Sequence, residues 1–161
     1  MTLQSVVKLC SLLYPHDSLH VHSSPNTVPN TLVITASPPP LHSPNTCASV
    51  HRILQHLQST FQIHNGVVIY AKTRRECEGL AQELLLRGWG RVQCYHAGLS
   101  ASVRKATQRR FQVNDIHILV ATLAFGMGIH KPDIRAVLHI GPPDTLEEYV
   151  QEIGRGGRDT A

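Results

Sequence analysis

The sequence has few charged residues, few aromatic side chains and few cysteines, and this composition limits the classes of protein to which the chain can belong. Only 16% of its 161 residues are charged and 5% are aromatic. No apolar run approaches the roughly 18–20 residues of a membrane span, so no membrane association is expected. The four cysteines lie apart without a C-x-x-C pair, which favours neither a disulfide framework nor a zinc knuckle. We therefore expect an intracellular protein in a reducing compartment.

What is present favours a folded domain with a polyanionic partner. Hydrophobic residues make up 42% of the chain, enough for a core, and the formal net charge is +4. Residues 100–112 carry four cations and no acid, and this run is either a phosphate-binding helix face or simply a solvated one. The eleven histidines lack ligand spacing, so no metal site is predicted.

The chain changes character at about residue 47. Residues 23–46 are rich in Pro, Ser and Asn and repeat the tripeptide PNT, which indicates a linker with one short strand near 32–35. From residue 47 onward, β-branched runs alternate with amphipathic segments. Short strands are expected at 67–70, 92–95, 116–121 and 136–140.

The helices between these strands have recognisable ends. Helices are expected over 46–60, from a Thr73/Glu76 capping box to Gly88, over 100–111, and from Thr145 through residue 153. In the third of these, Val103, Ala106 and Phe111 are expected to face inward. The alternation predicts an α/β fold, a parallel sheet covered by helices. Ligands of such folds bind loops at the carboxyl ends of the strands, here after residues 70, 95, 121 and 140.

Two of the segments after strands carry chemistry. The loop that starts at Thr122 places Gly126 and Gly128 one residue apart, and such a loop either holds a phosphate or is only a tight turn. Near the C-terminus, Arg155 and Arg158 stand three apart among glycines. A guanidinium forks onto phosphate oxygens, so this segment is either an arginine finger or a merely soluble loop.

Three strings together resemble a known family. YHAGL at 95–99, VATLAFGMGIHKPDIRAVLH at 120–139 and QEIGRGGRD at 151–159 are similar, in order and spacing, to the second RecA-like domain of RecQ helicases. The resemblance covers roughly the last hundred residues. DEAD-box RNA helicases share the architecture but lack the FGMG-KPD string. Residues 135–139 look most similar to the eukaryotic branch implicated in Rothmund–Thomson syndrome, which implies the nucleus.

The resemblance implies a RecA-like three-layer α/β fold and an ATP-dependent 3′–5′ DNA helicase acting in DNA repair, recombination or replication. Arg158 matches the arginine finger, Arg155 its partner on the phosphates, and Gln151 a residue that couples nucleotide state to the domain interface. The residues implied on the nucleotide side are Gly128, His130, Arg155 and Arg158. Those implied to contact single-stranded or forked DNA are Thr73, Arg74, His96, Thr122, Phe125 and Gly126. For His96, a position beside the core is an equal alternative.

The sequence also departs from the family pattern. His130 stands where Asn or Asp is usual, Gly156 replaces an alanine, and neither a G-x-x-x-x-G-K-[ST] loop nor a D-E-x-H motif occurs. In the family those two motifs hold ATP and Mg²⁺ in the first motor domain, the expected partner of this one. We expect residues 1–22 to be the tail of that domain, 23–46 a linker, and 47–161 a C-terminal domain truncated at its end. Alone, the chain should hydrolyse no ATP; the alternative function is an inactive fragment that binds nucleic acid or regulates a partner.

Overall fold

The computed structural model describes residues 19–22, 32–36, 45–122, 131–140, 145 and 147. These residues form six strands and three helices: β1 (Leu19–His22), β2 (Leu32–Ala36), α2 (Asn45–Phe61), β3 (Val67–Tyr70), α3 (Arg74–Leu86), β4 (Val92–Tyr95), α4 (Ala101–Gln112), β5 (Ile118–Ala121) and β6 (Ala136–Ile140). In this part of the chain no helix is long and apolar enough to cross a membrane. The helix predicted from Thr145 through residue 153 falls almost wholly outside the described residues.

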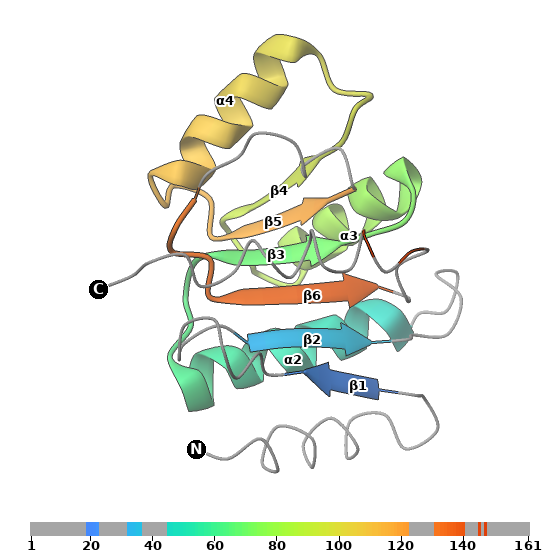
Figure 1. The fold of residues 1–161 in the computed structure, drawn as a ribbon, viewed down its shortest axis with the longest axis vertical. Coiled ribbons are helices and arrows are strands. Elements are labelled where there is room, and N and C mark those ends of the chain that lie inside the picture. The colour runs from blue at the N-terminus through green and yellow to red at the C-terminus, as the bar shows by residue number, and fades with distance from the viewer. Residues whose placement is uncertain are drawn as a thin grey trace.

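The six strands form one sheet in the order β1-β2-β6-β3-β5-β4. Strands β2 to β6 run parallel, as predicted, and Figure 1 shows their arrows pointing the same way. The edge strand β1 is an exception, because it pairs antiparallel with β2. The predicted strand near 32–35 is confirmed, and it hydrogen-bonds directly to β6 within the sheet. The division of the chain at residues 22 and 46 stays a prediction.

Both faces of the sheet are covered. Alternate residues of β3 point to opposite sides, so Val67 and Ile69 join one core cluster while Val68 and Tyr70 join another. The first cluster includes the apolar faces of α2 and α3, and the second includes Phe111 of α4. Strands buried on both faces need continuous apolar sequence, which is what VVIY and ILVA supply. The predicted three-layer α/β fold is confirmed.

Helix α4 packs differently from the prediction. Phe111 is buried as expected, but Val103 and Ala106 are exposed, and Thr107 is the second buried residue of the helix. Thr107 and Phe111 lie four positions apart and therefore share one face. The inward face is set by Phe111 near the end of the helix, and apolar side chains in the first turns are left facing solvent.

A buried lysine holds the segment before β6. Lys131 is 1% exposed, and its Nζ donates to Oδ1 of Asn114 at 2.8 Å and to Oδ1 of Asp133 at 2.7 Å. The Nδ2 of Asn114 donates to the other oxygen of Asp133 at 3.0 Å, and the ammonium lies 5.1 Å from the Phe111 ring centroid. A buried ammonium is tolerated only when it is paired and hydrogen-bonded. This cluster therefore fastens the end of α4 to the start of β6.

Gly66 fixes the same region from the other side. Its φ of +68° favours glycine, and a Cβ there would stand 2.3 Å from the carbonyl oxygen of Asp133. The amide of Arg135 donates to the carbonyl of Gly66 at 2.8 Å. The 131–135 turn thus packs directly against the backbone that leads into β3.

We predict that Asp133→Asn lowers the free energy of unfolding by about 3 kcal/mol, because it leaves Lys131 buried beside a neutral amide. Burial alone would raise the pKa of Asp133, but hydrogen bonds from Lys131 and Asn114 and the charge of Lys131 outweigh it and lower that pKa. The stabilisation is present above the unfolded value of about 3.9 and is lost as pH falls through the lower folded pKa.

Denaturant titrations of both proteins across this acid range should show the difference shrinking as pH falls. The control is Asp115→Asn, since Asp115 pairs with Arg110 at an exposed site and its loss should change stability little. Equal effects of the two substitutions at neutral pH would contradict the account of the buried cluster.

Candidate functional site

The carboxyl ends of β3, β4 and β5 are tied together by backbone hydrogen bonds. The amide of Ala71 donates to the carbonyl of Ala121 at 2.8 Å, and the amide of Thr122 donates to the carbonyl of Tyr95 at 3.1 Å. The residues that follow these strands therefore start from one edge of the sheet. This is the edge at which the sequence predicted ligand contacts.

Thr73 opens α3 at this edge with the predicted capping box. Its Oγ1 accepts from the amide of Glu76 at 3.2 Å, while its own amide donates to Oε2 of Glu76 at 2.9 Å. The amides of Arg74 and Arg75 occupy the first two helical positions, where no carbonyl within the helix can accept from them. Donors of this kind, at the positive end of the helix dipole, suit an anion.

Cys77 fastens the first turn of α3 to the strand ends. Its Sγ lies 3.0 Å from the carbonyl oxygen of Val120 and 3.8 Å from that of Tyr95. Burial raises the pKa of the Cys77 thiol to about 12, so the side chain stays protonated and its one S–H can donate to either carbonyl. The role of this cysteine is to position α3, not to react.

Arg74 and His96 meet at Gly98. A Cβ on Gly98 would lie 3.0 Å from Nη1 of Arg74 and 3.1 Å from Nδ1 of His96, so the bare glycine lets both side chains approach its backbone. Nε2 of His96 lies 2.9 Å from Oε1 of Glu78, although the two groups are not aligned for a hydrogen bond. The loop after β3 and the loop after β4 are thereby brought side by side.

The four described residues that the sequence assigned to nucleic-acid contact differ in exposure. Thr73 and Arg74 are exposed and Thr122 is half-buried, but His96 is only 3% exposed. His96 therefore lies beneath the surface that the other residues form, where it contacts Glu78 and flanks Gly98. The remaining predicted site residues lie outside the described part of the chain: Phe125, Gly126, Gly128, His130, Gln151, Arg155 and Arg158.

The basic run of α4 divides between the two ends of the helix. Ser100 caps α4 with its Oγ accepting from the amide of Val103, so the first-turn residue Arg104 starts near the loop after β4. Arg109 and Arg110 lie in the last turn, where cations stabilise the negative end of the helix dipole. Arg110 also pairs with Asp115 at 2.6 Å. Only the start of the basic run therefore belongs with the candidate site.

Sequence reasoning missed Glu78 and Gly98. Glu78 lies one turn after Thr73 on an exposed helix face, and nothing in the local sequence indicates its histidine partner 18 positions later. Gly98 could have been found, because it lies within YHAGL beside the predicted His96. Among the described residues, no group of three or more potential ligands is arranged to hold a metal ion.

The architecture is that of a RecA-like helicase domain. One of the solved structures it resembles is the RNA helicase Prp28 from Chaetomium thermophilum bound to ADP, with a TM-score of 0.61 and 28% identity. That match covers 83% of this chain and 30% of the Prp28 chain.

Sequence comparison names the family. Residues 48–160 match the family described as Helicase conserved C-terminal domain, and the chain belongs to that family. It is 46% identical over 92 residues to the ATP-dependent DNA helicase RecQ of Pasteurella multocida, a match to 57% of this chain and 14% of the relative. It is 41% identical over 112 residues to the human ATP-dependent DNA helicase Q4, covering 62% of this chain and 9% of the relative. The chain thus spans a small part of the relatives it matches.

We predict that Thr73→Ala lowers the free energy of unfolding by about 1 kcal/mol, because the amide of Glu76 loses its acceptor at the start of α3. Thr73→Asp should cost much less, because a carboxylate caps a helix well and is favoured at its N-terminus. Urea unfolding of the two variants and the wild type measures both effects. Equal losses in the two variants would show that the threonine methyl group, not the cap, supplies the stability.

Proposed function

We propose that this chain is the second motor domain of a RecQ-type, ATP-dependent 3′–5′ DNA helicase. We further propose that the surface at the carboxyl ends of β3, β4 and β5, formed by Thr73, Arg74 and Thr122 and called the strand-end edge below, holds the backbone of single-stranded DNA. The observation that carries the proposal is the convergence of Thr73, Arg74 and Thr122 on one edge, with His96 beneath them. The similarity to RecQ and to the human helicase Q4 supports the DNA-directed class. The proposal includes a location in the nucleus and a role in DNA repair, recombination or replication.

The chemistry of this edge suits phosphates more than bases. Arg74 offers a planar fork of donors, the first amides of α3 are free of acceptors within the helix, and Lys72 and Arg75 add exposed positive charge beside Thr73. The ring of His96 is buried, so it would not contact DNA itself. It would instead support Gly98 and Arg74 beneath the bound DNA strand. Contacts of this kind bind any sequence, and their affinity falls as salt rises.

The nucleotide side of the proposal rests on residues outside the described part of the chain. Arg158 would stabilise charge that develops on the transferred phosphoryl group of ATP, with Arg155 on the phosphates and Gln151 coupling the nucleotide to domain closure. Gly128 and His130 would lie near the nucleotide, and Phe125 and Gly126 near the DNA strand. A first RecA-like domain would hold ATP and Mg²⁺, and this chain would complete the site from across the interface.

We predict that Arg74→Gln weakens the affinity for a single-stranded oligonucleotide about tenfold at low salt and reduces the slope of log affinity against log salt by about 0.7, the loss of one phosphate contact. Fluorescence anisotropy of labelled oligo-dT over a salt series measures both quantities. Thr73→Asp should also weaken binding while it keeps α3 capped, because the added carboxylate repels phosphate.

Arg110→Gln serves as the matched control for this series. It removes one arginine charge from the far end of α4, where Asp115 already neutralises it, and should leave affinity and slope nearly unchanged. If Arg74→Gln changes affinity and slope no more than Arg110→Gln does, the proposal that the strand-end edge binds DNA is wrong.

We predict that Arg158→Ala, in a protein that joins this chain to a first RecA-like domain, lowers DNA-stimulated ATP turnover by on the order of 10³-fold. ATP affinity should change little, because the finger acts mainly on charge that develops in the transition state. Arg158→Lys should not restore turnover, since an ammonium lacks the planar fork. Turnover, nucleotide affinity and DNA affinity are measured on the same variants; a collapse of DNA affinity with intact turnover would make Arg158 a DNA contact.

A further inference from the structure

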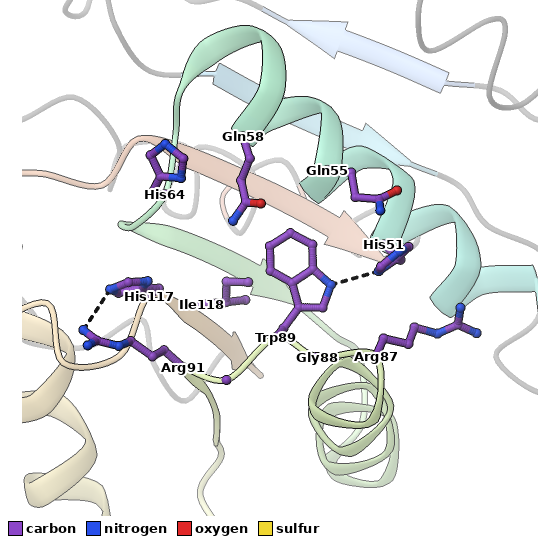
Figure 2. Close-up of a pocket in the computed structure, with 11 residues that line it drawn as sticks. His51, Gln55, Gln58, His64, Arg87, Gly88, Trp89, Arg91, His117 and Ile118 are labelled. Atoms are coloured by element: carbon purple, nitrogen blue, oxygen red, sulfur yellow. Dashed lines mark hydrogen bonds between the residues drawn. The ribbon is translucent and has the colours of Figure 1, made fainter.

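A second concave site lies away from the strand-end edge. It is a pocket of about 410 Å³ between α2 and the segment that joins α3 to β4, and it reaches the start of β5. Figure 2 shows Trp89 in the middle of this pocket, with Arg91 and His117 at one end. His117 precedes β5 and Thr122 follows it, so this end is separated from the strand-end edge by the length of the strand, roughly 13 Å.

The hydrogen bonds inside the pocket fix the tautomers of two histidines, which accept in both of them. The Nε1–H of Trp89 donates to Nδ1 of His51 at 2.9 Å, so Nδ1 is the acceptor and the proton of the neutral ring is on Nε2. Arg91 Nη1 lies 3.2 Å from Nε2 of His117. A guanidinium can only donate, so His117 accepts at Nε2 and carries its proton on Nδ1. The remaining N–H of each ring is left as a donor.

The ionised side chains that line the pocket are both cations. Its lining includes Arg87, Arg91 and three histidines, and no Asp or Glu. The two nearby acids are already engaged: Glu83 pairs with Arg87 at 3.1 Å, and Asp115 pairs with Arg110. Burial, then the positive charges of Arg91 and His64, lowers the pKa of His117 against the opposing charge of Asp115. The Arg91 guanidinium is thus held by a neutral ring. The carboxylate that acts on it, Asp115, lies outside the lining and pairs with Arg110.

Trp89 supplies a flat surface between these donors. The indole is half-buried, packs against the core and is held edge-on to His51, with ring centroids 5.8 Å apart and an interplanar angle of 81°. Its orientation is therefore set before any ligand binds. Gln55 and Gln58 of α2 line the same space and can both donate and accept.

We propose that this pocket binds a nucleotide unit, with the phosphate at Arg91 and His117 and the base against the Trp89 indole. A site with a surplus of donors and positive charge selects an anion with many acceptor oxygens, which a phosphate is. A fixed tryptophan beside it selects a planar ring. The volume falls within the range of small-molecule sites. The site shares no residue with the strand-end edge, so this inference does not depend on the proposed helicase function.

Trp89 is the one tryptophan of the chain, so excitation at the red edge of indole absorption reports on this pocket alone. We expect AMP to quench the fluorescence of the full chain in a saturable way and adenosine to bind at least about tenfold more weakly, because it lacks the charged contact. Inorganic phosphate should displace AMP. Octathymidylate distinguishes the source: quenching by AMP only indicates a free nucleotide, and quenching by the oligonucleotide also indicates a unit within a strand.

Arg91→Gln should weaken AMP binding at least about tenfold. The matched control Arg52→Gln removes an exposed arginine of α2 outside the pocket lining and should leave AMP binding unchanged. The proposal is overturned if AMP leaves Trp89 fluorescence unaltered, if adenosine binds as tightly as AMP, or if hexaglutamate binds more tightly than AMP. The ligand comparison needs no variant and stays decisive if Arg91→Gln impairs folding.

Discussion

Burial of both faces of a parallel sheet is the constraint on which the rest of this structure depends. Strands β3, β5 and β6 are buried at every position, and their side chains are apolar except for Tyr70 and His139. Polar chemistry is confined to the places where strands end. Because five strands run in one direction, their ends form two edges of different character.

The two edges differ in the side chains that add to their backbone hydrogen bonds. At the carboxyl edge, backbone amides and the Cys77 thiol bind the strand ends to each other and to α3, so exposed side chains such as Arg74 project from a fixed base. At the amino edge, backbone hydrogen bonds such as that from Arg135 to Gly66 are joined by side-chain bonds from Lys131 to Asn114 and Asp133. The carboxyl edge leaves the first amides of α3 without acceptors in the helix, whereas the Lys131 ammonium is paired within its own cluster.

The sequence could predict the features that depend on neighbours along the chain. The apolar run at residues 67–70 and the Thr73/Glu76 capping box are local, and both are confirmed. The antiparallel pairing of β1, the burial of His96 and the exposure of Val103 depend on what packs against each residue from elsewhere. Lys131 is the clearest case: its partner Asn114 lies 17 positions away, and a lone lysine gives no sign of a buried ammonium. The roles of Arg155 and Arg158 stay predictions.

The close contact at Gly66 has a consequence for how such sequences can diverge. The Cβ of any other residue at this position would clash with the carbonyl oxygen of Asp133. The backbone there also has a positive φ, which L-residues avoid. Position 66 is therefore open to change only together with the 131–135 turn. A side chain at residue 66 and a rearranged 131–135 turn would have to appear together, although residues 67–130 of the chain separate the two segments.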